Sequence, residues 1–147
     1  MEDIVLSEEC PTPGEYIALR SLVGWSIPGP AAIASSLRNS HFCLCARARG
    51  ELVGMARIIG DGGMVYYIQD VIVAPACQGM GIGQRLMDRV MEYIRGHAVE
   101  NTIVGLMAAG GKEAFYERYG FIRRPNGKMG AGMTIFWDAE KGDKAVE

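Results

Sequence analysis

A glycine-rich segment near the middle of the chain has the composition of an anion-binding turn. It runs Gln78-Gly79-Met80-Gly81-Ile82-Gly83, between an apolar stretch and a stretch with helical periodicity. Glycine lets backbone N–H groups approach a phosphate oxygen without an intervening Cβ, and the dipole of the following helix adds positive charge. The alternative is a plain turn without a ligand, but three glycines here would lower helix stability by about 1 kcal/mol each. We therefore predict a phosphate-bearing ligand at this turn.

Two common phosphate-binding motifs do not fit this segment. The G-x-x-x-x-G-K-S/T pattern of ATP- and GTP-hydrolysing proteins is absent from the chain. The dinucleotide pattern G-x-G-x-x-G, begun at Gly79, requires glycine at position 84, where the chain has Gln84. Nucleoside triphosphate hydrolysis and dinucleotide binding are therefore both disfavoured.

Asp70 is an acidic residue within an otherwise apolar stretch, Met64–Val73, which predicts a central strand. An unpaired carboxylate is costly to bury, so Asp70 needs a partner or a role. It can act as a general base, directly or through water. Equally, it can hold a backbone group or form a salt bridge with Arg57 on the preceding strand. Tyr67 and Gln69 point to the opposite face if the strand is regular, whereas a bulge would reset that alternation.

Hydrophobic periodicity and turn residues predict the elements that position these side chains. Helical spacing predicts helices over Glu15–Gly24, Ala31–Arg38, Gly83–Ala98 and Lys112–Tyr119. Short apolar runs predict strands over Phe42–Ala48, Leu52–Ile59, Met64–Val73, Thr102–Ala108 and Met133–Trp137, the last closing the sheet. The order indicates one α/β (α+β) domain over residues 1–147, with an early antiparallel meander and a later strand-helix-strand unit. The polar tail, residues 138–147, is expected to be flexible.

Composition restricts the classes of partner and the compartment. The 147 residues carry a net charge of -2 and are 49% hydrophobic, so the chain can form a core but has no broad cationic surface for nucleic acid. From the first residues we expect no secretory signal. No apolar run approaches the length of a transmembrane helix, about 20 residues. The four cysteines lack zinc-site spacing and are expected to be buried, reduced thiols. We therefore expect a cytoplasmic protein without nucleic-acid, membrane or metal partners.

The glycine turn and a second motif together resemble the GNAT superfamily of N-acetyltransferases. Residues Gln78 to Gly83 are similar to the family pattern Arg/Gln-x-x-Gly-x-Gly/Ala at every constrained position. About 35 residues downstream, Phe115-Tyr116-Glu117-Arg118-Tyr119-Gly120-Phe121 is similar to the family's FYE-x-x-GF signature. The resemblance covers roughly residues 15–137. It implies the GNAT fold, a mixed central sheet with an antiparallel N-terminal meander, a strand-helix-strand coenzyme unit and flanking helices.

The same resemblance implies acetyl-CoA as co-substrate and assigns residues to it. Its pyrophosphate is expected at the glycine turn, and its pantetheine arm is expected to pair with the preceding strand as an additional strand would. The implied coenzyme-binding residues are Val71, Ile72, Val73, Gln78, Gly79, Met80, Gly81, Ile82, Gly83 and Gln84. The backbone N–H of Val71 is the implied donor to the oxyanion.

Acetyl transfer to an amine requires a neutral nucleophile and a proton for the departing thiolate. An alkylamine with a pKa of about 10.4 is only on the order of 0.1% neutral at pH 7, and Asp70 is the candidate base. By the resemblance, Tyr116 lies beside the coenzyme sulfur and is the candidate acid; packing in the core with its aromatic neighbours is the alternative. Many family members have Asn seven residues before this tyrosine. Ala109 stands there in this chain, which removes one coenzyme contact that the resemblance would otherwise imply.

The acceptor is expected to contact the loop between the first two helices. Trp25 lies in this Pro/Gly-rich loop and either forms a wall of the acceptor site or packs in the core. Tyr67 is a second candidate for contact with the acceptor. The resemblance implies transfer to the primary amine of a small molecule by direct attack in a ternary complex. Protein or peptide acetylation and a non-catalytic acyl-CoA-binding module are the alternatives. An amino-sugar acceptor is a further option, because the segment Ile68-Gln69-Asp70 is similar to a segment of the amino-sugar phosphate acetyltransferases of this superfamily. Proteins similar to this one are commonly homodimers, so a homodimer is possible here as well.

Overall fold

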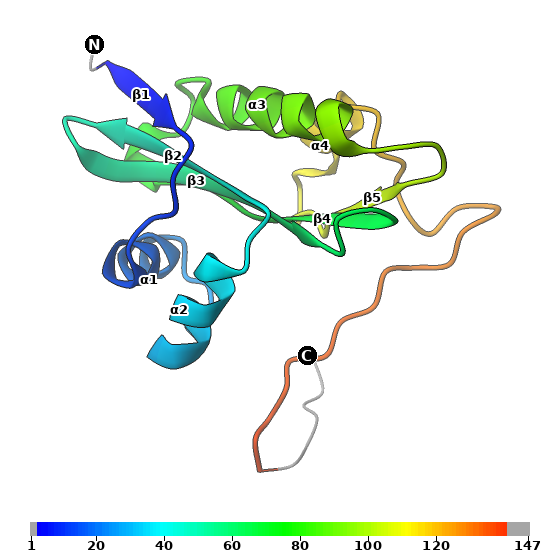
Figure 1. Ribbon diagram of the computed structural model, residues 1–147, viewed down its shortest axis with the longest axis horizontal. Coiled ribbons are helices and arrows are strands. Elements are labelled where there is room, and N and C mark those ends of the chain that lie inside the picture. The colour runs from blue at the N-terminus through cyan, green and yellow to red at the C-terminus, as the bar shows by residue number, and fades with distance from the viewer. Residues whose placement is uncertain (1–2, 141–147) are drawn as a thin grey trace. The chain divides into compact units, whose positions relative to one another are not determined.

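The computed structural model describes residues 3–140, which divide into two compact units on either side of the Leu106–Met107 bond. In the described residues, the first unit holds a five-stranded sheet in the order β1-β2-β3-β4-β5 and three α-helices (Figure 1). Its elements are β1 (Ile4–Ser7), α1 (Pro13–Leu22), α2 (Pro30–Arg38), β2 (Phe42–Ala48), β3 (Glu51–Gly60), β4 (Val65–Val73), the short 3-10 helix η1 (Pro75–Cys77), α3 (Ile82–His97) and β5 (Ile103–Gly105). The second unit holds α4 (Glu113–Glu117).

The sheet is mixed, as the sequence predicts. Strands β1 to β4 are antiparallel to their neighbours, and β5 runs parallel to β4. The meander is set by turn residues. Arg49 and Gly50 take positive φ angles of 51° and 80° between β2 and β3, and the side chain of Asp61 accepts three backbone N–H groups between β3 and β4.

The helices cover the two faces of the sheet differently: α3 lies on one face, and α1 and α2 lie on the other (Figure 1). The buried stripe of α3 consists of Ile82, Leu86, Met87, Val90 and Ile94. A Cβ built on Gly54 in β3 would meet Ile82 and Leu86 at 3.3 and 3.4 Å. The absence of a side chain at Gly54 therefore lets α3 pack closely on the sheet.

A capping box defines the start of α1. The Thr12 hydroxyl accepts from the Glu15 N–H at 3.1 Å, and the Glu15 carboxylate accepts from the Thr12 N–H at 3.0 Å. The same carboxylate receives two N–H groups from Arg47 of β2, at 2.6 and 3.1 Å. These contacts fix α1 to the sheet and start the helix at Pro13, two residues before the predicted start at Glu15.

Several predicted elements require correction. Residues 131–138 adopt no regular structure, so the prediction of a closing strand at Met133–Trp137 is wrong; Met133 and Trp137 are exposed and pair with no strand in the described structure. Strand β5 is three residues long rather than the predicted seven, 102–108. Strand β1, which the sequence did not predict, extends the sheet along the free edge of β2. Most of the predicted flexible tail, residues 141–147, lies outside the described residues.

The cysteines differ from the prediction of buried thiols at two positions. Cys43 and Cys45 on β2 are buried, as expected, but Cys10 is exposed and Cys77 is half-buried. The Sγ atom of Cys10 lies 2.7 Å from that of Cys43, because the segment between β1 and α1 crosses over β2. Within residues 3–140, none of the helices has the length and apolar character that crossing a membrane needs.

Candidate active site

Strand β4 contains a bulge at Asp70. Arg57 on β3 pairs with Gln69 on β4, and Met55 pairs with Ile72. Two residues of β4, Asp70 and Val71, therefore oppose one residue of β3, Ala56. Asp70 has a φ angle of 60°, a left-handed conformation in a residue that is not glycine. The bulge resets the alternation of the strand, as one of the two readings of the sequence expects. It turns the Asp70 side chain toward α1.

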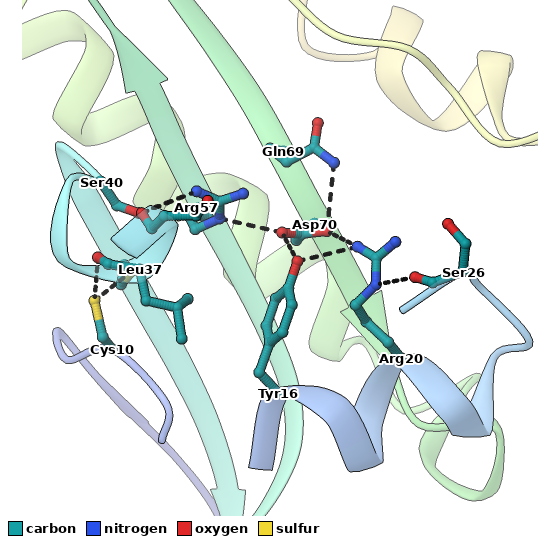
Figure 2. Close-up of polar contacts among 11 residues, drawn as sticks. Cys10, Tyr16, Arg20, Ser26, Leu37, Ser40, Arg57, Gln69 and Asp70 are labelled. Atoms are coloured by element: carbon teal, nitrogen blue, oxygen red, sulfur yellow. Dashed lines mark hydrogen bonds and ion pairs between the residues drawn. The ribbon is translucent and has the colours of Figure 1, made fainter. Parts of the chain in front are cut away.

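The Asp70 carboxylate is buried and accepts from side chains on α1, β3 and β4, as Figure 2 shows. Arg20 donates from Nη1 at 2.7 Å, Tyr16 donates from its hydroxyl at 2.6 Å, and Arg57 donates from Nε at 3.1 Å. A longer contact comes from the neighbouring Gln69 amide at 3.4 Å. Two guanidinium groups therefore share one carboxylate.

Of the alternatives that the sequence left open for Asp70, the structure shows the salt bridge with Arg57. The sequence reasoning missed Arg20 and Tyr16. Their spacing is a signal that could have found them, since residues four apart lie on one face of a helix and this pair is polar on the face that α1 buries. The role of Asp70 as a base stays a prediction. Because three strong donors occupy its oxygens, the geometry favours an anchoring role.

Tyr16 acts as a donor within this network. Burial, followed by the hydrogen bond to Asp70, raises the pKa of the Tyr16 phenol above its ordinary value of 10.0. The phenol therefore stays protonated at physiological pH. The Arg20 guanidinium also donates to the Tyr16 oxygen at 3.0 Å, so the phenol links the two charged groups.

A cavity of about 180 Å³ lies against this network. Its polar wall consists of Tyr16, Arg20, Ser36, Arg57 and Gln69, and the remaining wall is formed by Pro28 and by apolar side chains of α2. The acceptor was expected in this region, near the loop between α1 and α2. The cavity is thus the candidate acceptor site of the first unit.

The two predicted acceptor residues lie outside the wall of this cavity. Trp25 is half-buried, and its ring lies 5.4 Å from the Arg20 guanidinium, so it packs over that group. Tyr67 is half-buried on β4, opposite Ile59 on one side and Gly105 on the other. Direct acceptor contact by either residue stays a prediction. The structure gives Trp25 a role in holding Arg20.

The predicted coenzyme strand has an open edge in the first unit. Strand β5 pairs with β4 only from Val65 to Tyr67, where Tyr67 lies opposite Gly105. Val71, Ile72 and Val73 lie beyond that point, so no strand within residues 3–106 pairs with this edge of β4. Backbone N–H and C=O groups along such an edge can pair with an extended ligand.

The glycine turn leads into α3 as the sequence predicts. Gly79 and Gly81 take φ angles of 83° and 79°, and Gly81 is the N-cap of α3 without a side-chain cap. An ideal Cβ on either glycine would meet nothing within 4 Å, so open space lies in front of the turn. The Gln78 side chain donates to the Val73 carbonyl at 3.2 Å and ties the turn to β4. Exposed helix-start amides and an open approach fit a pyrophosphate group.

Tyr116 lies on α4 in the second unit, within an aromatic cluster. Its ring packs edge-on against Phe115 at 5.0 Å and Phe121 at 6.4 Å. Burial raises the pKa of the Tyr116 phenol above 10.0, which keeps it protonated as a general acid must be. The cluster also fits the alternative of a packing role, and the assignment stays a prediction. Among the described residues, no group of His, Cys, Asp or Glu side chains is placed to hold a metal ion.

Comparison with known proteins identifies the family. The profile of the acetyltransferase (GNAT) family matches residues 7–121, and the chain belongs to this family. A probable acetyltransferase of unknown function from methicillin-resistant Staphylococcus aureus is 32% identical and superposes with a TM-score of 0.85, covering 92% of this chain and 100% of that one. These matches confirm the predicted resemblance and the predicted fold class.

Two curated relatives are longer than this chain. An uncharacterized N-acetyltransferase of Pyropia yezoensis is 30% identical over 119 residues, which cover 78% of this chain and 65% of the relative. Serotonin N-acetyltransferase 2 of rice, a chloroplastic protein, is 37% identical over 81 residues, which cover 55% of this chain and 40% of the relative. The aligned parts thus make up between 40% and 65% of these relatives.

Proposed function

We propose that the chain is an N-acetyltransferase that transfers the acetyl group of acetyl-CoA to the primary amine of a small molecule, by direct attack in a ternary complex. The observation that carries this proposal is the open edge of β4 beside the uncapped start of α3. In the first unit, β5 pairs with β4 only as far as Tyr67, and Gly81 begins α3 without a side-chain cap. Membership of the GNAT family and the names of the relatives support the same activity.

The chain binds acetyl-CoA mainly through its backbone in this proposal. The amides of the turn and of the first turn of α3, from Gly79 to Gln84, hold the pyrophosphate, and the dipole of α3 favours its negative charge. The edge of β4 at Val71–Val73 pairs with the pantetheine arm. The coenzyme supplies an activated acetyl group as a thioester, and the turn and the strand hold it in a fixed orientation.

The remaining steps belong to side chains and to one amide. The Val71 N–H, next to the bulge, donates to the oxyanion that forms at the acetyl carbonyl. Tyr116 donates its proton to the departing thiolate, and its raised pKa keeps that proton available. Asp70 holds Arg20 and Arg57 in place at the acceptor cavity, and water takes the proton of the amine.

The size of the cavity supports a small acceptor. Pockets for drug-sized ligands measure roughly 300–1,000 Å³, and this cavity is smaller, at about 180 Å³. The rice relative is named for serotonin, a small primary amine. Cytoplasmic location and a homodimer remain predictions of the sequence.

Thiol release from acetyl-CoA with a panel of amines tests the proposal. The panel contains small alkyl- and arylalkylamines, amino acids, an amino sugar and a lysine-containing peptide. We expect steady turnover with at least one small amine and weak or no turnover with the peptide. Binding of acetyl-CoA without turnover for any amine would contradict the proposal in favour of a coenzyme-binding module, and turnover with the peptide alone would favour protein acetylation.

A further inference from the structure

The cavity beside the β4 bulge carries an excess of buried positive charge. The side chains of Arg20 and Arg57 are only 10% and 9% exposed, and both line the cavity. Asp70 supplies one negative charge for two guanidinium groups. The other polar groups of the wall, from Tyr16, Ser36 and Gln69, are neutral. A buried charge without a counter-charge is costly, so the cavity is electrostatically incomplete as it stands.

Each guanidinium also has donor capacity left over. Arg20 uses Nε on the Ser26 carbonyl and Nη1 on Asp70 and Tyr16. Arg57 uses Nε on Asp70 and Nη1 on the Ser36 carbonyl and the Ser40 hydroxyl. Within residues 3–140, neither Nη2 group has an acceptor. Two nitrogens with up to four N–H groups are therefore available at the cavity.

Both guanidinium groups are held in place from several sides. Asp70 accepts from one nitrogen of each, as Figure 2 shows. The Trp25 ring packs over Arg20, and the Ser36 carbonyl of α2 and the Ser40 hydroxyl accept from Arg57. Ordering the donors in advance reduces the entropy lost on binding an anion. Guanidinium groups match carboxylate and phosphate oxygens in geometry and charge.

We propose that this cavity binds an anionic group of the acceptor, a carboxylate or a phosphate, through Arg20 and Arg57, so that the preferred acceptor is an amine that also carries an acid group. The inference rests on the proposed acetyl transfer. It makes the cavity a specificity site for one end of the acceptor, and a volume of about 180 Å³ suits such a group with its nearest carbon atoms.

Matched acceptor pairs test the preference. An amino acid is compared with its amide, and phosphoethanolamine with ethanolamine, as acceptors in the thiol-release assay. We expect the acidic member of one pair to have a kcat/KM at least about 10-fold higher, mainly through KM. The pair that shows the preference distinguishes a carboxylate from a phosphate. Equal or better use of the neutral member in both pairs would overturn the proposal.

A charge placed in the cavity gives a second test. Ser36 lines the cavity and is exposed at its rim, so Ser36→Asp supplies the missing negative charge without removing a buried partner. We expect this variant to lose the preference for the acidic acceptor and to keep its KM for acetyl-CoA. Ser35→Asp, on the same helix but outside the cavity wall, is the matched control and should keep the preference. A preference that survives Ser36→Asp would contradict the assignment.

A binding readout separates this proposal from the proposed function. Inorganic phosphate and acetate are titrated against chloride at matched ionic strength, and the melting temperature is followed. We expect at least one of the two anions to raise the melting temperature of the unaltered protein and of Ser35→Asp by more than that of Ser36→Asp. The glycine turn can also bind phosphate and does so equally in all three proteins, so the difference between them reports the cavity. An equal rise in Ser36→Asp, or no rise with either anion, would overturn the site. Failure of acetyl-CoA to bind in a separate calorimetric titration would overturn the proposed function alone.

Discussion

At the scale of single residues, the centre of the site is Asp70. It has a positive φ, which costs on the order of 1–3 kcal/mol for most residues other than glycine, although Asp tolerates this region better than most. Three donors hold its carboxylate in place and offset that cost. The bulge therefore aims the Asp70 carboxylate at Arg20 and Arg57, and it lies directly before Val71, whose amide is the proposed donor to the oxyanion.

Asp70→Asn should act mainly on stability. The substitution leaves two nearly buried guanidinium groups without a counter-charge, so we expect the free energy of unfolding to fall by about 3–5 kcal/mol. Chemical denaturation measures this as a lower midpoint with an unchanged slope. Adding Arg57→Met should recover part of the loss, because one unpaired charge is then removed. A fully stable Asp70→Asn enzyme that has lost turnover would favour the base role instead.

Tyr116→Phe should act mainly on turnover. The change removes one oxygen and preserves the ring contacts with Phe115 and Phe121, so we expect kcat to fall by about 100-fold or more. Affinity for acetyl-CoA should stay within a few-fold. The raised pKa places the alkaline limb of the pH–rate profile above pH 10.0, and that limb should move or vanish in the variant. Tyr119→Phe is the control and should leave kcat nearly unchanged. Unchanged turnover in Tyr116→Phe would contradict the acid role and favour a packing role for Tyr116.

Sequence reasoning could predict some residue contacts of the site and not others. Arg57 could be named as one of the alternative partners of Asp70 because neighbouring strands of a short meander must pair, which limits the choice of partner. Arg20 lies 50 positions away on a helix whose placement against the sheet depends on tertiary packing. Local periodicity indicates which face of α1 is buried, but it does not indicate which strand that face meets.

At the scale of elements, the site depends on how α1 is attached to the sheet. The Glu15 carboxylate caps the helix and also pairs with Arg47 on β2. Arg47, through a hydrogen bond, and then the Thr12 N–H lower the pKa of Glu15 from 4.5 to about 2. Since Tyr16 and Arg20 follow on the same helix, this attachment sets the position of the side chains that reach Asp70.

Glu15→Gln should weaken the attachment in a pH-dependent way. Glutamine can still cap the helix, so the variant removes mainly the charge. The folded-state pKa is below the unfolded value, so the ion pair contributes stability above pH 4.5 and loses it as the pH falls from 4.5 toward 2. We expect the variant to be less stable by about 1 kcal/mol at neutral pH, because the side chain is partly exposed and screened. The two stability curves should converge in acid, and Glu100→Gln, on an exposed loop, should match the unaltered protein throughout.

Two strands show where element prediction failed. β1 has only four residues, too few for a clear alternation, and it forms because β2 offers a free edge in the folded chain. Met133–Trp137 has strand-like composition but finds no pairing partner in the described structure. A segment with strand-like composition forms a strand only where it can pair with a neighbouring strand, and the tertiary fold determines whether such a neighbour is present. The central strands and α3, by contrast, have long patterns and were predicted within about two residues.

At the scale of the whole molecule, the coenzyme should contribute to the stability of the fold. A ligand that binds only the folded chain stabilises it by about 2.7 kcal/mol at 100 times its dissociation constant. We expect acetyl-CoA to raise the melting temperature in a concentration-dependent way, and Gly81→Val to lose most of that rise. The reason is the φ angle of 79° at Gly81, which a β-branched residue rarely adopts. Gly96→Ala, near the other end of α3 with open space around it, is the control and should keep the full increase in melting temperature. A full increase in Gly81→Val would mean that the coenzyme binds elsewhere.

The cysteine arrangement determines how the activity of this protein is best measured. An aromatic disulfide reagent that counts the thiol of coenzyme A also reacts with the chain. Burial raises the pKa of Cys43 to about 12 and that of Cys45 to about 11, so neither reacts quickly, whereas Cys10 is exposed. Once the reagent has formed a mixed disulfide at Cys10, the Cys43 sulfur beside it can displace the second aromatic thiolate. We expect this pair of cysteines to release two equivalents in a burst before any amine is added, and Cys10→Ser should remove that contribution from the baseline for turnover.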